Sequence, residues 1–229
     1  MIINPYSVVP AVQNKVVKDF SDTKYFQATT NAFGGGITGT KRLVFRVESL
    51  PSGGQKLIAS KVYSGIGWYV RTLGAVIDVV MNGASTISAG FTILAGHVGQ
   101  SFVLHFTNDG TSLKMYINGL SAGAAANSTG SPNPSGSALF NIGTYQLAPS
   151  LFNPHLGVQN YNETASVLSD AQVDADATAI INQGSNIVYQ EMTSSIHNLV
   201  ADDLTSGSNW TDRISGSINV YGLPTIANI

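Results

Sequence analysis

The 229-residue chain contains no cysteine, and charged residues make up only 10% of it. The absence of cysteine excludes disulfides, thiol catalysis and zinc sites with cysteine ligands. Because charged residues usually account for about 25% of a globular protein, solubility here must come from Ser, Thr, Asn, Gln and Gly. Such a surface argues against a helical bundle. The formal net charge of −2 provides no broad basic field, so we expect neither a nucleic-acid partner nor binding to an anionic membrane.

The sequence also lacks targeting and membrane-spanning patterns. Its first residues, "MIINPYSVVPAVQNK", have neither the charged region nor the continuous apolar run of a secretory signal, and no apolar run reaches membrane-spanning length. A surface suited to an extracellular, glycan-facing protein, without export signal or disulfide, favours localisation in a virion. Such a protein is made in the cytoplasm of a bacterial host and released by lysis. An ordinary cytoplasmic protein and a subunit exported by another route are the alternatives.

The chain is rich in short strand patterns separated by turn-forming residues. β-Branched and aromatic residues predict strands over 42–47, 56–62, 66–71, 75–82, 101–107, 112–118, 139–143 and 155–161. In 101–107 and 112–118 apolar residues recur at every second position. Asp109-Gly110 lies between these two segments and tolerates the positive φ of a tight turn, so we expect a hairpin there.

One helix is predicted, over 168–184. Ser169 is a suitable N-cap, and Gln172, three residues later, completes a capping box. The residues expected to form its apolar stripe are Val173, Ala177, Ile180 and Ile181. Gly184 is placed to end the helix. A long run of strands is therefore followed by one short amphipathic helix, which must cover part of the sheet.

The order of these segments resembles the laminin-G / concanavalin-A-like lectin family. "FVLHFTNDGTSLKMYING" resembles the family's hairpin, "LFNIG" its following strand, "HLGVQNYNETASVLSDAQV" its late strand and helix start, and "FSDTKYFQATT" its opening strand. The resemblance covers roughly residues 20–185. It implies an all-β fold, a two-sheet antiparallel jelly-roll sandwich with one short amphipathic helix on the C-terminal side. In the late strand, Gly157 is followed by Val-Gln-Asn-Tyr without the acidic residue common there, so we carry over no site residues.

This resemblance divides the chain into three expected parts. We expect an N-terminal arm over 1–19, a lectin-like β-sandwich domain over 20–185 and a C-terminal extension over 186–229. The extension has too little apolar mass to fold alone. It either docks as a tail, wraps the sandwich or adds a strand to a neighbour. Trp210, which lies in this extension, is expected to make an assembly contact.

Two patterns that suggest catalysis are better explained otherwise. "GLSAG" (119–123) matches the Gly-x-Ser-x-Gly nucleophile elbow with Ser121, but no helix can follow it in "AAANSTGSPNPSG". "GGGITG" (34–39) matches a dinucleotide-binding pattern, but the strand "RLVFRV" follows instead of a helix. We interpret both as turns or loops.

Glycosidases share this jelly roll, and their chemistry requires two carboxyl groups about 5 to 9.5 Å apart. The three glutamates, Glu48, Glu163 and Glu191, are isolated from one another. Asp174 and Asp176 fall within the helix, where we expect them on the solvent side. No catalytic residues are therefore assigned.

The four histidines, His97, His105, His155 and His197, lack metal-ligand spacing. His105 is expected on a plain sheet surface. We expect no metal and no cofactor.

Sugar binding needs an aromatic platform beside polar groups. In "GIGWYVR", Trp68 is expected in the core, while Tyr69 and Arg71 share the opposite face. Tyr69 and Arg71, together with Tyr145 in the loop 144–154, are therefore the candidate ligand-binding residues.

The sequence therefore predicts a non-enzymatic surface protein of a bacteriophage virion. It would decorate a capsid or belong to a fibre or adhesion device, assembling with other virion proteins and as a homo-oligomer, with a cell-surface glycan as a further ligand. A monomeric carbohydrate-binding module is the alternative, and a glycoside hydrolase is a weaker one.

Overall fold

The computed structural model describes residues 15–28, 38–64, 66–82, 87–126, 137–145, 148–183, 189, 191–192, 195–204, 209–212, 216–221 and 225–229. The strands are β1 (Lys15–Lys18), β2 (Tyr25–Gln27), β3 (Gly39–Val47), β4 (Gln55–Tyr63), β5 (Ile66–Leu73), β6 (Val76–Asn82), β7 (Ile87–Thr92), β8 (Ser101–Asn108), β9 (Ser112–Ile117), β10 (Leu120–Ala126), β11 (Phe140–Ile142), β12 (Leu156–Thr164), β13 (Ser195–Val200), β14 (Asn209–Asp212), β15 (Gly216–Tyr221) and β16 (Thr225–Asn228). The helix α1 covers Asp170–Ile181, and short 3-10 turns cover Ala95–His97, Pro149–Leu151 and Ala201–Asp203. None of the described helices is long and apolar enough to cross a membrane.

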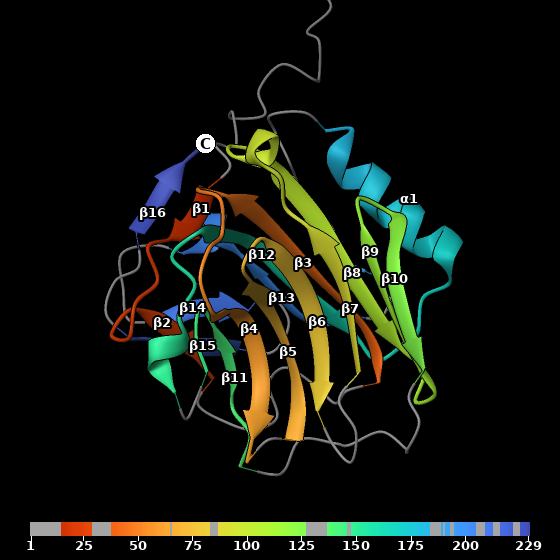
Figure 1. Ribbon diagram of the computed structural model, residues 1–229, viewed down its shortest axis with the longest axis horizontal. Helices are drawn as coiled ribbons and strands as arrows, with labels where there is room; N and C mark the ends of the chain where they lie inside the picture. The colour runs from red at the N-terminus through yellow and green to blue at the C-terminus, as the bar shows by residue number, and fades with distance from the viewer. Residues whose placement is uncertain are drawn as a thin grey trace, which may run out of the picture.

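The strands form two antiparallel layers (Figure 1). Hydrogen bonding follows the order β10-β9-β8-β3-β12-β13-β14-β15-β2-β11-β4-β5-β6-β7, and β1 pairs with β12 and β16. Strands β4, β5 and β6 lie in front of β3, β8 and β12 (Figure 1). The two end strands of the order, β7 and β10, lie next to each other. The predicted all-β, two-sheet antiparallel sandwich with one short helix is confirmed.

The main core fills the space between the layers. Trp68 is 0% exposed there, which confirms its predicted core position. Its ring lies 5.4 Å from the ring of Phe106 and stacks on Tyr161 at 6.3 Å, measured between ring centroids. Side chains alternate along each strand, so Leu43 and Phe45 enter this core while Val44 points to the opposite face.

Helix α1 covers that opposite face. Ser169 accepts a hydrogen bond from the backbone of Gln172, and the Gln172 side chain accepts one from the Ser169 backbone, which confirms the predicted capping box. The buried residues of the helix are Val173, Ala177 and Ile180. Ile181, predicted to share this stripe, is 46% exposed; at 3.6 residues per turn it lies at the stripe's edge and turns to solvent. Gly184 lies outside the described residues.

Two hairpin turns connect β8, β9 and β10. Asp109-Gly110 lies between β8 and β9 as predicted, and Gly110 adopts a φ of 93°. Asn118 and Gly119 connect β9 to β10 with φ of 53° and 83°, as a tight turn of the Asn-Gly type requires. Ser121 therefore lies in strand β10, and no nucleophile elbow exists there. Most of the other discounted pattern, residues 34–37, lies outside the described residues, and Gly39 begins β3.

The described strands beyond residue 186 belong to the same sheet order. Strand β13 pairs with β12, β14 joins β13 to β15, and β15 pairs with β2. Strand β16 pairs antiparallel with β1, with Lys15 opposite Asn228. The first and the last of the described strands are therefore both part of the sandwich.

Candidate functional site

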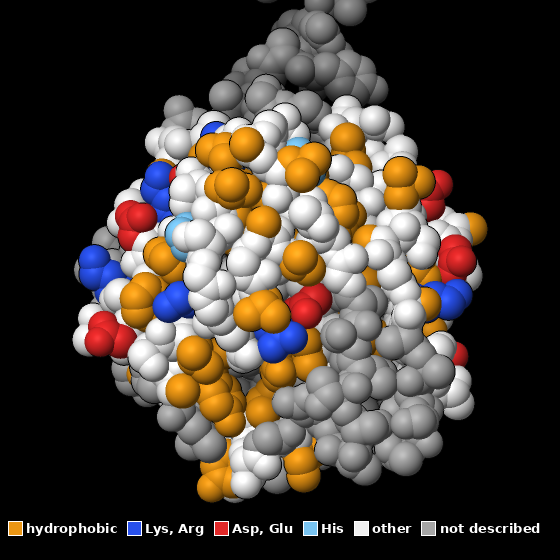
Figure 2. Space-filling view, in the orientation of Figure 1, with side chains coloured by type: hydrophobic (Ala, Val, Ile, Leu, Met, Phe, Trp, Pro, Cys, Tyr) orange, Lys and Arg blue, Asp and Glu red, His pale blue; other side chains and the backbone are white. Residues whose placement is uncertain are grey.

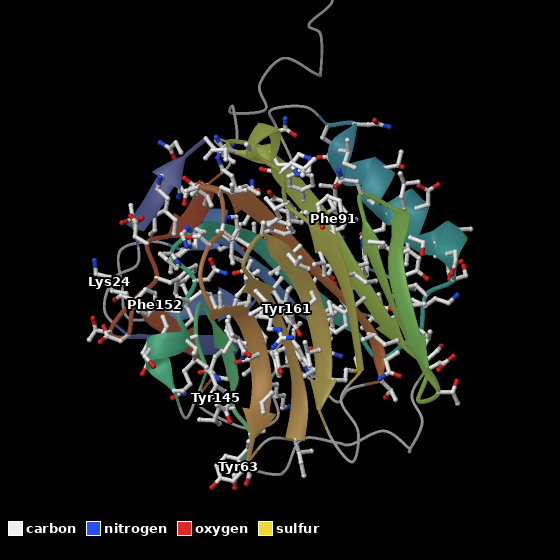
Figure 3. All side chains as sticks on the ribbon, viewed as in Figure 1. Lys24, Tyr63, Phe91, Tyr145, Phe152 and Tyr161 are labelled. Carbon is white, nitrogen blue, oxygen red and sulfur yellow. The ribbon has the colours of Figure 1, made fainter. Side chains whose placement is uncertain are left out.

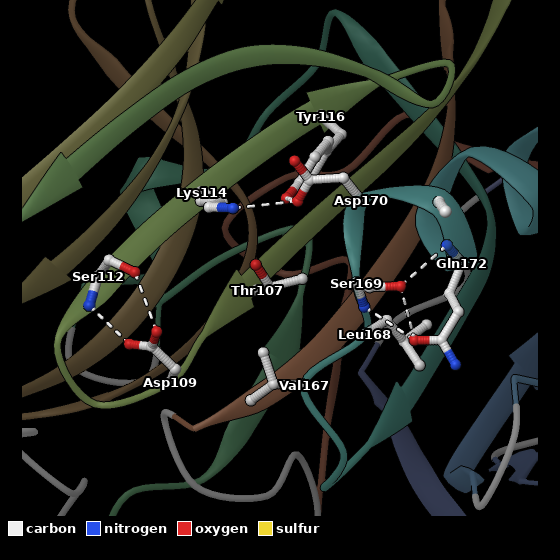
Figure 4. Close-up of a pocket in the computed structure, with 11 residues that line it drawn as sticks. Thr107, Asp109, Ser112, Lys114, Tyr116, Val167, Leu168, Ser169, Asp170 and Gln172 are labelled. Carbon is white, nitrogen blue, oxygen red and sulfur yellow. Dashed lines mark hydrogen bonds and ion pairs between the residues drawn. The ribbon is translucent and has the colours of Figure 1, made fainter.

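A cleft opens between the β8–β9 hairpin and the start of α1 (Figure 4). Its volume is about 540 Å³, within the roughly 300–1,000 Å³ typical of small-molecule sites. The hairpin contributes Thr107, Asp109, Ser112, Lys114 and Tyr116, and the helix start contributes Val167, Leu168, Ser169, Asp170, Ala171 and Gln172. Hydroxyl, amine and carboxyl groups thus share the cleft with an apolar wall.

Local periodicity brings these groups together. Ser112, Lys114 and Tyr116 occupy every second position of β9, so their side chains leave the sheet on the same side. The capping box begins α1 directly over that side, which places Asp170 in the first helical turn. Asp170 is favoured there because the positive end of the helix dipole stabilises a carboxylate.

Lys114, Asp170 and Tyr116 form a hydrogen-bonded cluster in the lining of the cleft (Figure 4). The Lys114 Nζ and the Tyr116 hydroxyl both donate to Asp170 Oδ1, at 3.0 and 2.7 Å. Both of these side-chain donors reach Oδ1 and leave Oδ2 of Asp170 to other partners. The side chains of Lys114 and Asp170 are 44% and 70% exposed. One carboxylate oxygen and part of an ammonium group are therefore open to a ligand.

The same contacts control ionisation in the cleft. The hydrogen bonds from Tyr116 and Lys114 lower the pKa of Asp170, and the bond to Asp170 raises the pKa of Lys114. Burial, and then the hydrogen bond to Asp170, raises the pKa of Tyr116. At neutral pH the cleft therefore presents an anion, a cation and a neutral phenol side by side.

Asp109 makes one rim of the cleft rigid. Its Oδ1 accepts hydrogen bonds from the backbone and hydroxyl of Thr111 and from the backbone of Ser112, each at 2.7 Å. Its Oδ2 accepts from the Ser112 hydroxyl at 3.2 Å. These donors, with those from Thr111 the strongest, hold the pKa of Asp109 well below its usual value. Asp109 is therefore an ionised carboxylate already engaged by its own turn.

A buried ion-pair network fastens α1 to the sheet beside the cleft. Arg42 Nη1 donates to both oxygens of Asp176 at 2.7 and 2.9 Å, and His105 Nε2 lies 2.8 Å from Asp176 Oδ2. Arg42 also donates from Nε to Asn160 at 3.1 Å. The helix that forms one wall of the cleft is thus anchored by the charge of Arg42 on β3 and by the His105 imidazole on β8.

Two predictions fail at this network. His105, expected on a plain sheet surface, is fully buried, and Asp176, expected on the solvent side of α1, faces the sheet with 17% of its side chain exposed. The helix itself covers that face of β8, which changes both environments. Burial lowers the pKa of His105 in spite of Asp176. Burial acts to raise the pKa of Asp176, but His105 and Arg42 outweigh it and keep that pKa low.

A smaller hollow of about 240 Å³ adjoins the cleft, because both include Leu168 and Gln172. Asp176, Glu191 and Met192 contribute to its lining. The open surface thus continues along α1 toward the buried network.

The predicted ligand-binding residues Tyr69, Arg71 and Tyr145 come together on the other layer, away from the cleft. Arg71 donates to Asp78 at 2.8 Å and to Gln55 at 2.8 Å, and its guanidinium carbon lies 5.6 Å from the centroid of the Tyr69 ring. Tyr145 is partly buried against the cluster that contains Tyr69 (Figure 3). Tyr69 is only 9% exposed.

These three residues therefore form a packed surface, with the polar groups of Arg71 used internally. Figure 2 shows this face of the molecule, where hydrophobic side chains lie between a few charged ones. Trp210 lies in β14 opposite Ile218, and its side chain is outside the described part of the structure.

No family model and no curated protein matches the chain. Among solved structures it is similar to a Bacteroides ovatus protein described as a candidate carbohydrate-binding protein, with a TM-score of 0.67 and 14% identity over 94% of this chain and 60% of that one. It is also similar to the receptor-binding domain of botulinum neurotoxin type G, with a TM-score of 0.53 and 13% identity over 72% of this chain and 44% of the other. The chain thus spans less than two thirds of either structure. At these identities the likeness establishes a shared fold, the antiparallel β-sandwich.

Proposed function

We propose that the chain is a non-enzymatic carbohydrate-binding domain and that the cleft between the β8–β9 hairpin and α1 holds the sugar. The observation that carries this proposal is the cleft's mixed lining, in which Lys114, Asp170 and Tyr116 converge beside the exposed Val167. A sugar hydroxyl both donates and accepts hydrogen bonds. Asp170 Oδ2 is suited to accept from one hydroxyl, Lys114 to donate to another, and Val167 to contact the C–H face of the ring.

The ionisation of the cleft favours binding over hydrolysis. A glycosidase needs one carboxyl group whose pKa is raised so that it can act as a general acid. The two carboxyl groups that line the cleft, Asp109 and Asp170, both have lowered pKa values because hydrogen-bond donors surround them. Neither group holds a proton at neutral pH. The description of the Bacteroides ovatus structure as a candidate carbohydrate-binding protein supports the same class of function.

The proposal is tested by screening the full chain against immobilised glycans and measuring the best ligand by titration calorimetry. Asp170→Asn and Lys114→Met are each expected to weaken binding roughly tenfold or more, because each removes a hydrogen bond to a charged group. Arg71→Met is the matched control on the opposite layer and should leave affinity unchanged. Full affinity in Asp170→Asn, together with loss in Arg71→Met, would move the site to Tyr69, Arg71 and Tyr145.

A role on a virion, as a decoration, fibre or adhesion component within a homo-oligomer, stays a prediction of the sequence, as does membership of the laminin-G group. The low charge and glycan-facing composition support it. Light scattering on the purified chain distinguishes an assembling virion component from a monomeric carbohydrate-binding module. A monomer that binds glycans supports a carbohydrate-binding module, whereas a defined oligomer supports assembly.

A further inference from the structure

A lysine and a glutamate face each other inside the sandwich, far from any solvent. Lys41 in β3 and Glu163 in β12 are direct cross-strand partners. The Lys41 Nζ lies 3.2 Å from Glu163 Oε1, and the two side chains are 0% and 1% exposed. The amine and the carboxyl carbon are therefore held in near contact by two long, paired strands.

The surroundings of this pair are aromatic. The Lys41 Nζ lies 5.5 Å from the centroid of the Trp68 ring and 5.7 Å from that of Phe106. The Tyr161 hydroxyl donates to Glu163 Oε2 at 2.7 Å. Tyr161, labelled in Figure 3, is itself buried between the layers. One carboxyl oxygen is thus held by a phenol while the other faces the amine.

A second lysine shares the site. Lys61 is buried, and its charge interacts with both Glu163 and Lys41. Burial lowers the pKa of Lys61, although Glu163 acts in the opposite direction. Two amines therefore lie near one carboxyl group in a medium of low dielectric constant, and burial favours the neutral form of Lys61.

An ordinary buried ion pair explains this arrangement poorly. A buried ammonium group normally has its donors satisfied, because an unsatisfied buried charge is costly. Within the described residues the Lys41 Nζ makes no well-aligned hydrogen bond, although it lies within ion-pair distance of Glu163. A neutral linkage would remove both charges from the core and leave only polar amide atoms to satisfy.

We propose that Lys41 and Glu163 react to form an intramolecular isopeptide bond that joins β3 to β12. The proton of the Lys41 ammonium first passes to the carboxyl group, directly or through the amine of Lys61, leaving a neutral amine and a neutral carboxylic acid. The amine nitrogen attacks the carboxyl carbon of Glu163 and a C–N bond forms. Negative charge develops on Oε2, where the Tyr161 hydroxyl stabilises it by its hydrogen bond.

The reaction is completed without any added reagent. The C–Oε1 bond breaks, Oε1 takes a proton from the attacking nitrogen, and it leaves as water. One ammonium and one carboxylate thus yield one amide and one water molecule, with no change in oxidation state. Holding the groups together on paired strands supplies the effective concentration that the step requires. The product is a covalent cross-link in a chain that contains no cysteine.

The deciding experiment is an intact mass measurement on the folded wild-type chain after prolonged incubation at neutral pH. The expected mass is that of the sequence minus one water molecule. Proteolytic digestion should then yield a branched peptide that contains Lys41 and Glu163. An unchanged mass would overturn the proposal, and so would a branch at Lys61 in place of Lys41. Because this test uses only the mass of the wild-type chain, poor folding of a variant does not affect its result.

Two variants sharpen this result. Lys41→Arg keeps the charge but removes the nucleophile, and the mass loss should disappear. Glu163→Gln can form the same bond with ammonia as the leaving group, so its cross-linked product should have the same mass as cross-linked wild type. A water loss that persists in Lys41→Arg would place the modification elsewhere and contradict the assignment.

Discussion

Two of the lysine–carboxylate pairs in the described part of the structure have nearly equal lengths but opposite environments. Lys41 and Glu163 are 3.2 Å apart with side chains 0% and 1% exposed, whereas Lys114 and Asp170 are 3.0 Å apart with side chains 44% and 70% exposed. The inner pair lies between the layers, and the outer pair lies in the cleft. Distance alone therefore does not distinguish their roles.

The two pairs contribute differently to folding and to ligand binding because water reaches only the outer pair. Water screens the outer pair, so the pair adds little to folding and its groups remain available to a ligand. The inner pair has lost its hydration, so removing one member leaves the other charge buried and uncompensated. The inner pair should be tied to folding and the outer pair to recognition.

The largest expected effect is that of Glu163→Ala, which leaves two lysines in the core without their carboxylate. We expect a loss of about 3–5 kcal/mol in the free energy of unfolding, together with any contribution from the proposed cross-link. Urea denaturation followed by tryptophan fluorescence measures it. Glu191→Ala, at an exposed glutamate, is the control and should unfold like wild type. Equal urea midpoints for the two variants would contradict the distinction between inner and outer pairs.

The Arg42–Asp176 pair is intermediate, since Arg42 is buried and Asp176 keeps some contact with solvent. Asp176→Ala should cost about 2–3 kcal/mol, below the full effect of breaking a buried pair. Asp174→Ala, on the exposed side of the same helix, is the matched control. Hydrogen exchange should show faster exchange of α1 amides only in Asp176→Ala. Unchanged protection in both variants would mean that apolar packing alone anchors the helix.

Lowering the pH is expected to reduce the free energy of unfolding by less than the two substitutions above. Because the pKa of His105 is lowered in the folded state, the unfolded chain binds a proton there first as the pH falls below about 6.5. Stability should therefore decrease between pH 7 and 5, and again below about pH 4, where the low pKa of Asp176 acts in the same direction. Urea denaturation across this range measures the loss.

His105→Gln should flatten the first phase of this acid response. His155→Gln should remove a smaller part of it, because His155 also has a pKa lowered by burial but is only partly covered. A pH profile unaffected by His105→Gln would show that His105 is not the titrating group.

The smallest effect on folding should come from the outer pair. Asp170→Asn should unfold at the wild-type urea concentration, while its glycan affinity falls as expected from the cleft geometry. A clear loss of stability in this variant would make the cleft pair structural and would remove the contrast with Lys41 and Glu163.

Features that depend on nearby residues were predictable from the sequence. The capping box of α1 needs only Ser169 and Gln172, the hairpin needs Asp109-Gly110 between alternating segments, and the core position of Trp68 follows from strand periodicity. Each of these is decided within a few residues, where backbone geometry and side-chain alternation act directly.

Features that depend on distant segments were not predictable. His105 looks like a surface residue until α1 covers its face, and Lys41 and Glu163 look like solvent-exposed charges until β3 and β12 pair with both inside the sandwich. The cleft likewise requires the helix start to lie over Lys114 and Tyr116. The polar face of the hairpin was visible in the sequence, but nothing local indicated that the helix would lie over it.

The antiparallel pairing of β1 with β16 brings Lys15 and Asn228 opposite each other. A segment whose first and last described strands are neighbours can be inserted into a surface loop of a host protein without forcing that loop apart. For the same reason, a circular permutant that joins Lys15 to Asn228 through a short linker and opens at Gly74-Ala75, between β5 and β6, should fold. The segment from Lys15 to Asn228 is thus suited to insertion into a loop of another protein.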